Sequence, residues 1–82
     1  MNLSGPEEWV VGDQMAVVVR RALLKMPRKR RDVVMLRLDG GLSYREIARV
    51  KRMSEGSARV LVHMGIKQIK EAVEKSAIDF QV

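Results

Sequence analysis

The chain has 82 residues, of which 46% are hydrophobic and 32% charged, and these values predict one small globular domain with a modest core. It contains no cysteine, which excludes a disulfide framework and a thiolate metal site. The net charge is +6, and no apolar stretch has the length of a membrane span or the pattern of a signal peptide, so we expect a cytoplasmic protein.

The basic residues are concentrated in the middle of the chain. Residues 20–70 contain fifteen Lys and Arg against four acidic residues, whereas residues 1–19 and 71–82 are net acidic. A positive field of this kind favours a polyanion such as DNA, because each neutralised phosphate releases counterions. For the charge alone, a solvated surface remains an equal alternative.

The first helix is expected over residues 7–25. Ser4-Gly5-Pro6-Glu7 supplies a capping hydroxyl, a proline in the first turn and a carboxylate near the positive end of the helix dipole. Met26 precedes Pro27 and is therefore disfavoured in helical geometry, which ends the helix. The residues at helical spacing that should form its buried stripe are Met15, Val19, Ala22, Leu23 and Met26.

Three further helices follow, over residues 28–38, 43–51 and 55–76, and no segment pairs as strands. Asp39-Gly40-Gly41 stops the second helix, which should bury a subset of Val33, Val34, Leu36 and Leu38. Ile47 and Ala48 should face inward from the third helix. One face of the fourth is formed by Ala58, Val62, Gly65, Ile69 and Val73. The predicted fold class is all-α, one four-helix domain covering residues 1–82.

Two helix starts lie close together in the second half of the chain. Ser43 and Glu46 have the spacing of a capping box, in which each side chain accepts a hydrogen bond from a free backbone N–H of the first turn. Ser54 offers a hydroxyl cap to the next helix. A short helix, a tight turn and a longer helix predict a C-terminal helix-turn-helix, whose second helix can enter a DNA major groove.

Several segments together resemble region 4, the C-terminal domain, of the extracytoplasmic-function (ECF) group of bacterial sigma factors. They are Ala22-Leu23-Leu24-Lys25-Met26-Pro27, Arg31-Asp32-Val33, Leu36-Arg37-Leu38-Asp39-Gly40-Gly41-Leu42, Ser43-Tyr44-Arg45-Glu46-Ile47-Ala48 and Ser54-Glu55-Gly56-Ser57. The resemblance implies a winged-helix-like domain of the sigma region 4 type that recognises the −35 promoter element. It also implies contact with the RNA polymerase β flap and binding by an anti-sigma factor. A response-regulator helix-turn-helix, which shares the Glu-Ile-Ala segment, is the main alternative among DNA-binding families.

The resemblance also implies a set of DNA contacts. Arg37, Tyr44 and Arg45 would lie near phosphates, and the start of the fourth helix would lie along the groove. Arg59 is within reach of a guanine edge, a contact that discriminates between bases by about 1–3 kcal/mol. We expect DNA contacts from Arg31, Arg37, Tyr44, Arg45, Ser54, Glu55, Gly56, Ser57, Arg59, Val60 and His63, and steering charge from Arg28, Lys29 and Arg30. Backbone N–H groups at residues 55–57 can hold a phosphate.

The chain departs from the family pattern in the turn before the fourth helix. Lys51 and Arg52 stand where the family usually has a Leu-Gly pair. If Arg52 adopts a left-handed conformation, it costs roughly 1 kcal/mol relative to glycine.

A second departure is that the fourth helix is apolar nearly all round from residue 60 to 66. Val60, Leu61, Met64 and Ile66 have no donors for phosphates or base edges. One hypothesis is that Leu61 or Ile66 belongs to the core, with Val60 free to contact a thymine methyl. The other is a protein-interaction module with weakened DNA contact, in which Leu61, Met64 and Ile66 bind an anti-sigma factor or a second copy of the domain.

The sequence gives no support for catalysis. It has no phosphate-binding glycine loop, no Ser/His/Asp set and no carboxylate pair whose spacing requires acid–base chemistry. His63 is the only histidine, so we expect no metal site, and no motif calls for a cofactor.

Overall fold

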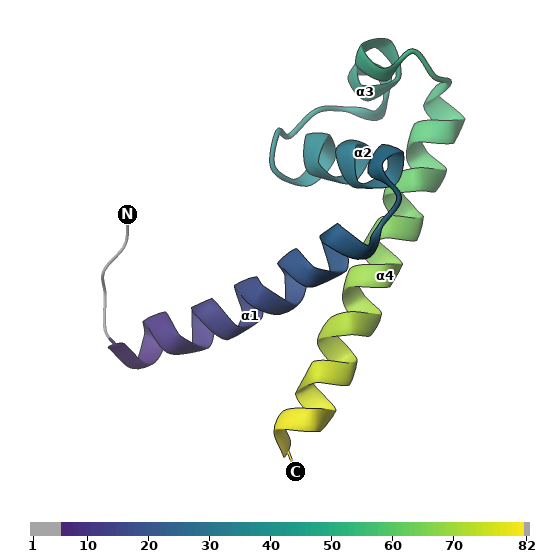
Figure 1. The fold of residues 1–82 in the computed structure, drawn as a ribbon. Helices are drawn as coiled ribbons and strands as arrows, with labels where there is room; N and C mark the ends of the chain where they lie inside the picture. The colour runs from purple at the N-terminus through teal and green to yellow at the C-terminus, as the bar shows by residue number, and fades with distance from the viewer. Residues whose placement is uncertain (1–5, 82) are drawn as a thin grey trace.

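The computed structural model describes the backbone of residues 6–81 and the side chains of residues 14–76. Four helices form in this part, and no strand is present within it: α1 (Pro6–Lys25), α2 (Arg28–Leu38), α3 (Tyr44–Lys51) and α4 (Glu55–Gln81) (Figure 1). The predicted all-α fold and the helix-turn-helix, formed by α3 and α4, are confirmed. α4 continues to Gln81, beyond the predicted end at residue 76. Ser4 and Gly5, predicted to precede the first helix, lie outside the described residues.

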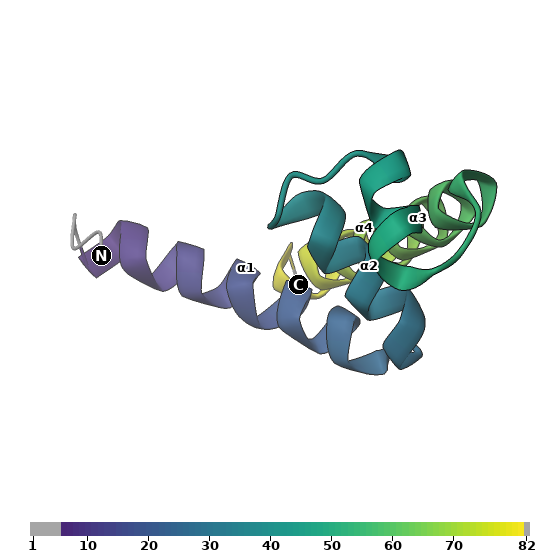
Figure 2. The same cartoon turned by 90° about the horizontal axis from the view of Figure 1, so that it is seen from above.

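The long helix α4 organises the fold. α1, α2 and α3 each pack against it, and α2 also contacts α3 (Figure 1). Seen from above, α1 extends away from the other three helices toward its N-terminal end (Figure 2). Nearly all contacts between helices in the described residues therefore involve α4.

The core is formed where α2, α3 and α4 meet. Val33, Ile47, Ala58 and Val62 are fully buried there. Half-buried side chains cover this cluster: Leu36, Leu42, Tyr44, Met53, Leu61 and Ile66. The inward positions predicted for Ile47 and Ala48 are confirmed.

The predicted stripe of α1 is correct only near the C-terminal end of the helix. Ala22 and Met26 are buried, and Val19 and Leu23 are half-buried. Met15 is 45% exposed, so its predicted burial is wrong. The reason is tertiary: α1 diverges from the other three helices toward its N-terminal end (Figure 2).

The end of α2 follows the predicted stop. The backbone N–H of Gly40 donates to the carbonyl of Met35 at 3.1 Å, and that of Leu42 donates to Leu36 at 3.1 Å. Gly41 adopts φ 68°, a conformation that glycine accepts without strain. These bonds turn the chain so that Leu42 reaches the core and α3 starts beside it.

Candidate nucleic-acid interface

The start of α3 has both bonds of the predicted capping box. The Glu46 N–H donates to Ser43 Oγ at 3.1 Å, and the Ser43 N–H donates to Glu46 Oε1 at 2.8 Å. The bond from the Ser43 backbone is the main reason that the pKa of Glu46 is lowered, with smaller contributions from the Ser43 hydroxyl and the charge of Arg49. The carboxylate therefore remains ionised at neutral pH and holds the first turn of α3.

In the turn between α3 and α4, Arg52 has the left-handed conformation that the sequence analysis considered as a condition. Arg52 adopts φ 55° and ψ 55°, and it is the one non-glycine residue with positive φ in the described part of the chain. The N–H of Met53 donates to the Ala48 carbonyl at 2.9 Å and closes the end of α3. The turn between α3 and α4 thus closes with a left-handed arginine, the conformation that favours glycine.

The start of α4 is capped by Ser54, as predicted. The Ser57 N–H donates to Ser54 Oγ at 3.0 Å, and the two serine hydroxyls are 2.9 Å apart. Since the Ser57 N–H is already used, the backbone N–H groups of Glu55 and Gly56 are the ones left for a phosphate. Both residues are exposed.

A shallow groove lies beside this helix start. It is lined by Lys29, Ser54, Gly56, Ser57, Val60 and Leu61. Lys29 comes from α2, so the fold brings a basic side chain to the groove at the positive end of the α4 dipole, and both attract an anion. The sequence analysis assigned Lys29 only a steering role, because nothing in a linear sequence indicates which basic side chain the fold brings to α4.

Three of the predicted DNA-contacting residues form a stack. The guanidinium carbon of Arg37 lies 4.6 Å from the centre of the Tyr44 ring, and that of Arg59 lies 5.0 Å from it. Arg37 Nη1 also donates to the Leu42 carbonyl at 2.9 Å. The stack joins α2, α3 and α4, and the sequence pattern gave no indication of it.

The other predicted contacts are distributed around this centre. Arg45, Val60 and His63 are exposed, and Arg31 is half-buried on α2. No hydrogen bond or ion pair among residues 14–76 joins Arg31 or Arg45 to the other predicted contacts. Their part in an interface remains a prediction.

Arg30 has a different role from the steering charge predicted for it. Its Nη1 donates to Gln68 Oε1 at 3.0 Å, and its buried Nε has no hydrogen-bond partner among the described residues. Arg30 therefore connects α2 to α4. In a similar way, Lys51 and Asp32 form an ion pair of 3.1 Å that connects α3 to α2.

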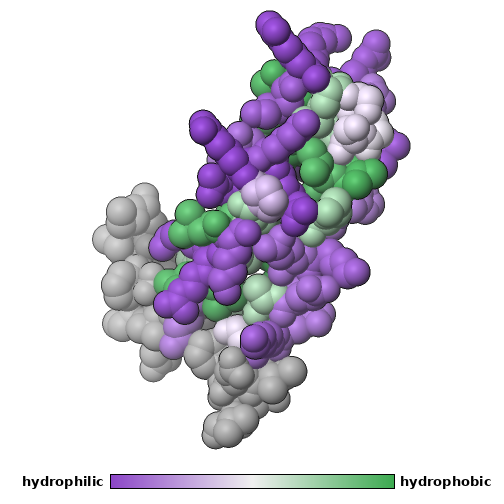
Figure 3. All heavy atoms as spheres, turned by 45° about the vertical axis from the view of Figure 1, so that its right-hand side comes forward, coloured by the Kyte–Doolittle hydropathy of each residue, from purple (hydrophilic) through white to green (hydrophobic). Residues whose placement is uncertain are grey.

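The apolar residues of α4 divide into two groups. Leu61 and Ile66 pack against the core, as the first of the two hypotheses supposed. Val60 and Met64 are 57% and 42% exposed. Of the three partner candidates, only Met64 presents a largely exposed side chain, and the apolar surface on this side lies in separate areas between hydrophilic side chains (Figure 3).

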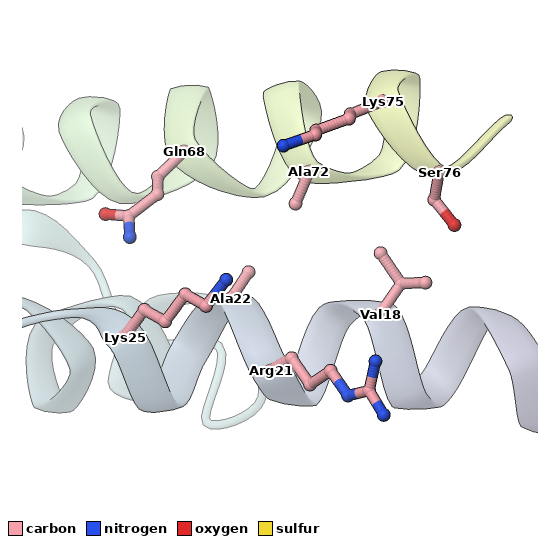
Figure 4. Close-up of a pocket in the computed structure, with 8 residues that line it drawn as sticks. All are labelled: Val18, Arg21, Ala22, Lys25, Gln68, Ala72, Lys75 and Ser76. Carbon is pink, nitrogen blue, oxygen red and sulfur yellow. The ribbon is translucent and has the colours of Figure 1, made fainter. Parts of the chain in front are cut away.

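A second hollow lies between α1 and the later part of α4 (Figure 4). Val18, Ala22 and Ala72 project into the space between the two helices and give it an apolar floor. Basic and polar side chains line the rest: Arg21, Lys25, Lys75, Gln68 and Ser76. This hollow is separate from the groove at the start of α4.

Among the residues that the structure describes, no three His, Cys, Asp or Glu side chains are grouped so that they could hold a metal ion. No helix in the same part of the chain is both long and apolar enough to cross a membrane.

The family model for sigma-70, region 4, matches residues 16–69. This chain belongs to the sigma-70 region 4 family. It is also 28% identical over 71 residues to the ECF RNA polymerase sigma factor ShbA of Streptomyces griseus subsp. griseus. The matched segment covers 87% of this chain and 37% of that protein. This chain thus corresponds to little more than a third of the relative's length.

Both comparisons confirm the predicted resemblance to region 4 of ECF sigma factors. They also support the coarser part of the predicted function, a DNA-binding domain of a sigma factor. The matched residues of this region 4 domain include all of α2 and α3 and the first half of α4. The capped helix starts and the arginine–tyrosine stack lie within that match.

Proposed function

We propose that this region 4 domain recognises the −35 element of bacterial promoters during transcription initiation, with the start of α4 in the major groove. The observation that carries the proposal is the start of α4, which is capped by Ser54, presents the exposed residues 55–57 and the stacked Arg59, and shares a groove with Lys29. A helix N-terminus with free N–H groups and adjacent cations fits the phosphates that border the groove.

Base recognition is assigned to the exposed side chains that follow the cap. Arg59 carries five N–H donors and suits the O6 and N7 acceptors of guanine. Val60, the next residue along the helix, is 57% exposed, and its apolar side chain suits the methyl group of thymine. His63 lies one turn later on the same helix and extends the contact surface along the groove.

The test is duplex binding measured by fluorescence anisotropy. The wild-type domain should bind a duplex selected from a randomised pool, with an affinity that falls linearly with salt on a log–log plot. Arg59→Ala should reduce the preference over a single-base-pair variant by about 1–3 kcal/mol. Lys67→Ala is the matched control, since Lys67 is exposed on α4 outside the proposed contact. Equal binding to all duplexes by the wild type would contradict the proposal.

The second part of the proposal is contact with the RNA polymerase β flap, through the hollow between α1 and α4. Its apolar floor and its basic rim of Arg21, Lys25 and Lys75 suit an amphipathic segment with acidic groups (Figure 4). Ala72→Glu should weaken binding of an isolated flap fragment in calorimetry, whereas Lys67→Glu should not. If both variants bind like the wild type, the flap contact lies elsewhere.

No observation favours the alternatives over promoter recognition. Leu61 and Ile66 are half-buried and pack against the core, so two of the three partner candidates have a structural role. The match to sigma-70, region 4, is evidence against a response-regulator helix-turn-helix. Binding by an anti-sigma factor stays a prediction.

A further inference from the structure

We propose that Tyr44 is a positioning residue for sequence readout, because its ring holds the guanidinium of Arg59 in the orientation needed at a base edge. The proposal rests on the proposed function and adds a specificity device to it. It differs from the phosphate contact that the family resemblance implies for Tyr44, since it uses the face of the ring and not the hydroxyl group.

The geometry of the stack supports this role. Two guanidinium carbons lie within 4.6 and 5.0 Å of the centre of one ring, inside the range of about 6 Å at which cations are attracted to aromatic faces. Arg37 comes from α2, Tyr44 from α3 and Arg59 from α4. Each of the three helices α2, α3 and α4 thus supplies one residue of the stack.

Tyr44 itself is held firmly. It is the first residue of α3, directly after the N-cap Ser43, and its ring packs against the buried core cluster. On the preceding side, the Leu42 carbonyl accepts the 2.9 Å hydrogen bond from Arg37. The ring therefore has a defined position before any ligand binds.

Arg59 is free for a ligand in every other respect. It is exposed, and none of its side-chain N–H groups is used in a hydrogen bond or ion pair with another residue of the described part. Glu55 stands four residues earlier on the same helix, a spacing that suits a salt bridge, yet no such pair forms within the described residues. An aromatic face attracts the guanidinium plane without occupying its N–H donors, so these donors remain available for the acceptors of guanine.

Preorganisation is the physical advantage of this arrangement. An unrestrained arginine loses much rotamer freedom when it binds a base edge, and an arginine already stacked has lost part of it beforehand. The stack should therefore favour the base contact of Arg59 specifically. It should affect nonspecific phosphate binding much less, because that binding tolerates many side-chain orientations.

The experiment compares Tyr44→Phe with Tyr44→Leu. For each variant, anisotropy gives the ratio of two dissociation constants: that for the single-base-pair duplex variant whose rejection depends on Arg59, divided by that for the duplex selected by the wild type. We expect Tyr44→Leu to lower this ratio about two- to fivefold, the factor that corresponds to a surface cation–π contact. Tyr44→Phe should keep the wild-type ratio, since it retains the ring.

Each contrary result has a distinct meaning. If the wild type shows no sequence preference, the proposed function itself fails. If the wild type discriminates and Tyr44→Leu discriminates equally well, the positioning role is overturned. Loss of discrimination in Tyr44→Phe as well would assign the effect to the hydroxyl group and would also overturn it.

A second measurement keeps the proposal testable if Tyr44→Leu does not fold. In the free wild-type domain, NMR should show the side-chain protons of Arg59 shifted upfield by the Tyr44 ring current. The shift should persist in Tyr44→Phe. Unshifted Arg59 protons in the free wild-type domain would overturn the proposal without any DNA.

Discussion

Gly65 of α4 lies directly against Val34 of α2, so close that a β-carbon at position 65 would overlap the Cγ2 atom of Val34. Val34 is fully buried, and the sulfur-bound methyl group of Met26 lies 3.6 Å from the same point. The absence of a side chain at this one position lets α4 approach α2. That close approach holds α2 against α4, and these two helices carry Arg37 and Arg59 of the stack.

Gly65→Ala should therefore destabilise the domain. Overpacking of a tight core costs about 1–3 kcal/mol, and the gain in helix propensity, about 1 kcal/mol, offsets only part of it. Urea unfolding followed by circular dichroism measures the difference.

Gly56→Ala is the matched control for Gly65→Ala. A β-carbon at position 56 would meet only the Ser54 hydroxyl, at 3.9 Å, so this variant should be as stable as the wild type or slightly more so. Equal stability of Gly65→Ala and the wild type would show that moving α2 away costs no more than the gain in helix propensity.

Glu46 should make the stability of the domain depend on pH. Its pKa is lowered in the folded state relative to about 4.5, so its ionised form stabilises the fold above that pH, and the contribution disappears as the pH falls through the folded-state pKa. Glu46→Gln keeps an acceptor oxygen but does not titrate. The difference in unfolding free energy between the two proteins should thus be greatest near neutral pH and shrink in acid.

Ser43→Ala separates the two halves of the capping box. The variant loses the hydroxyl acceptor, which costs about 1 kcal/mol, but keeps the backbone N–H that donates to Glu46. Most of the pH dependence should survive in it. A difference between the wild type and Glu46→Gln that is the same at every pH would contradict this account.

Arg52→Gly should stabilise the domain by about 1 kcal/mol, because glycine adopts the left-handed conformation without the steric cost of a β-carbon. Arg52→Ala is the control, since it removes the same charge and leaves the backbone cost in place. Thermal unfolding of the three proteins gives the order of stability. If Arg52→Ala gains as much as Arg52→Gly, the charge and not the backbone is responsible.

Lys29→Ala should weaken DNA binding by a similar factor for every duplex. An ammonium group beside the first turn of α4 is placed for a phosphate, and phosphates carry no sequence information. The slope of log affinity against log salt should fall by about one, whereas discrimination should stay at the wild-type value. A loss of discrimination would place Lys29 at a base.

Local patterns in the sequence were sufficient to predict the four helices and most of their ends, although α4 continues to Gln81, beyond its predicted end at residue 76. The Ser43–Glu46 box, the Ser54 cap and the Gly40–Gly41 stop depend on residues a few positions apart, and the structure contains all of them. Helical periodicity likewise identified Ile47, Ala58 and Val62 as core residues. It failed for Met15, because the same spacing exists whether or not another helix covers the side chain.

The candidate site was predictable as a set of residues but not as an arrangement. The resemblance indicated Arg37, Tyr44 and Arg59 separately, and only the packing of three helices brings them into one stack. The same holds for Lys29 beside α4. It holds too for Arg30, which donates a hydrogen bond to Gln68, 38 positions away in the sequence. Cation–π and long-range polar contacts leave no periodic signal in a sequence.

The sequence by itself thus determined the helix starts and the charge that suits DNA, since these follow from local backbone chemistry and composition, and its motifs indicated the family. The tertiary structure decided which apolar residues of α4 pack against the core and which basic side chains lie beside the start of α4. It also decided that Arg59 stacks on the ring of Tyr44. These depend on distances between helices, which are set by contacts such as that of Gly65 with Val34.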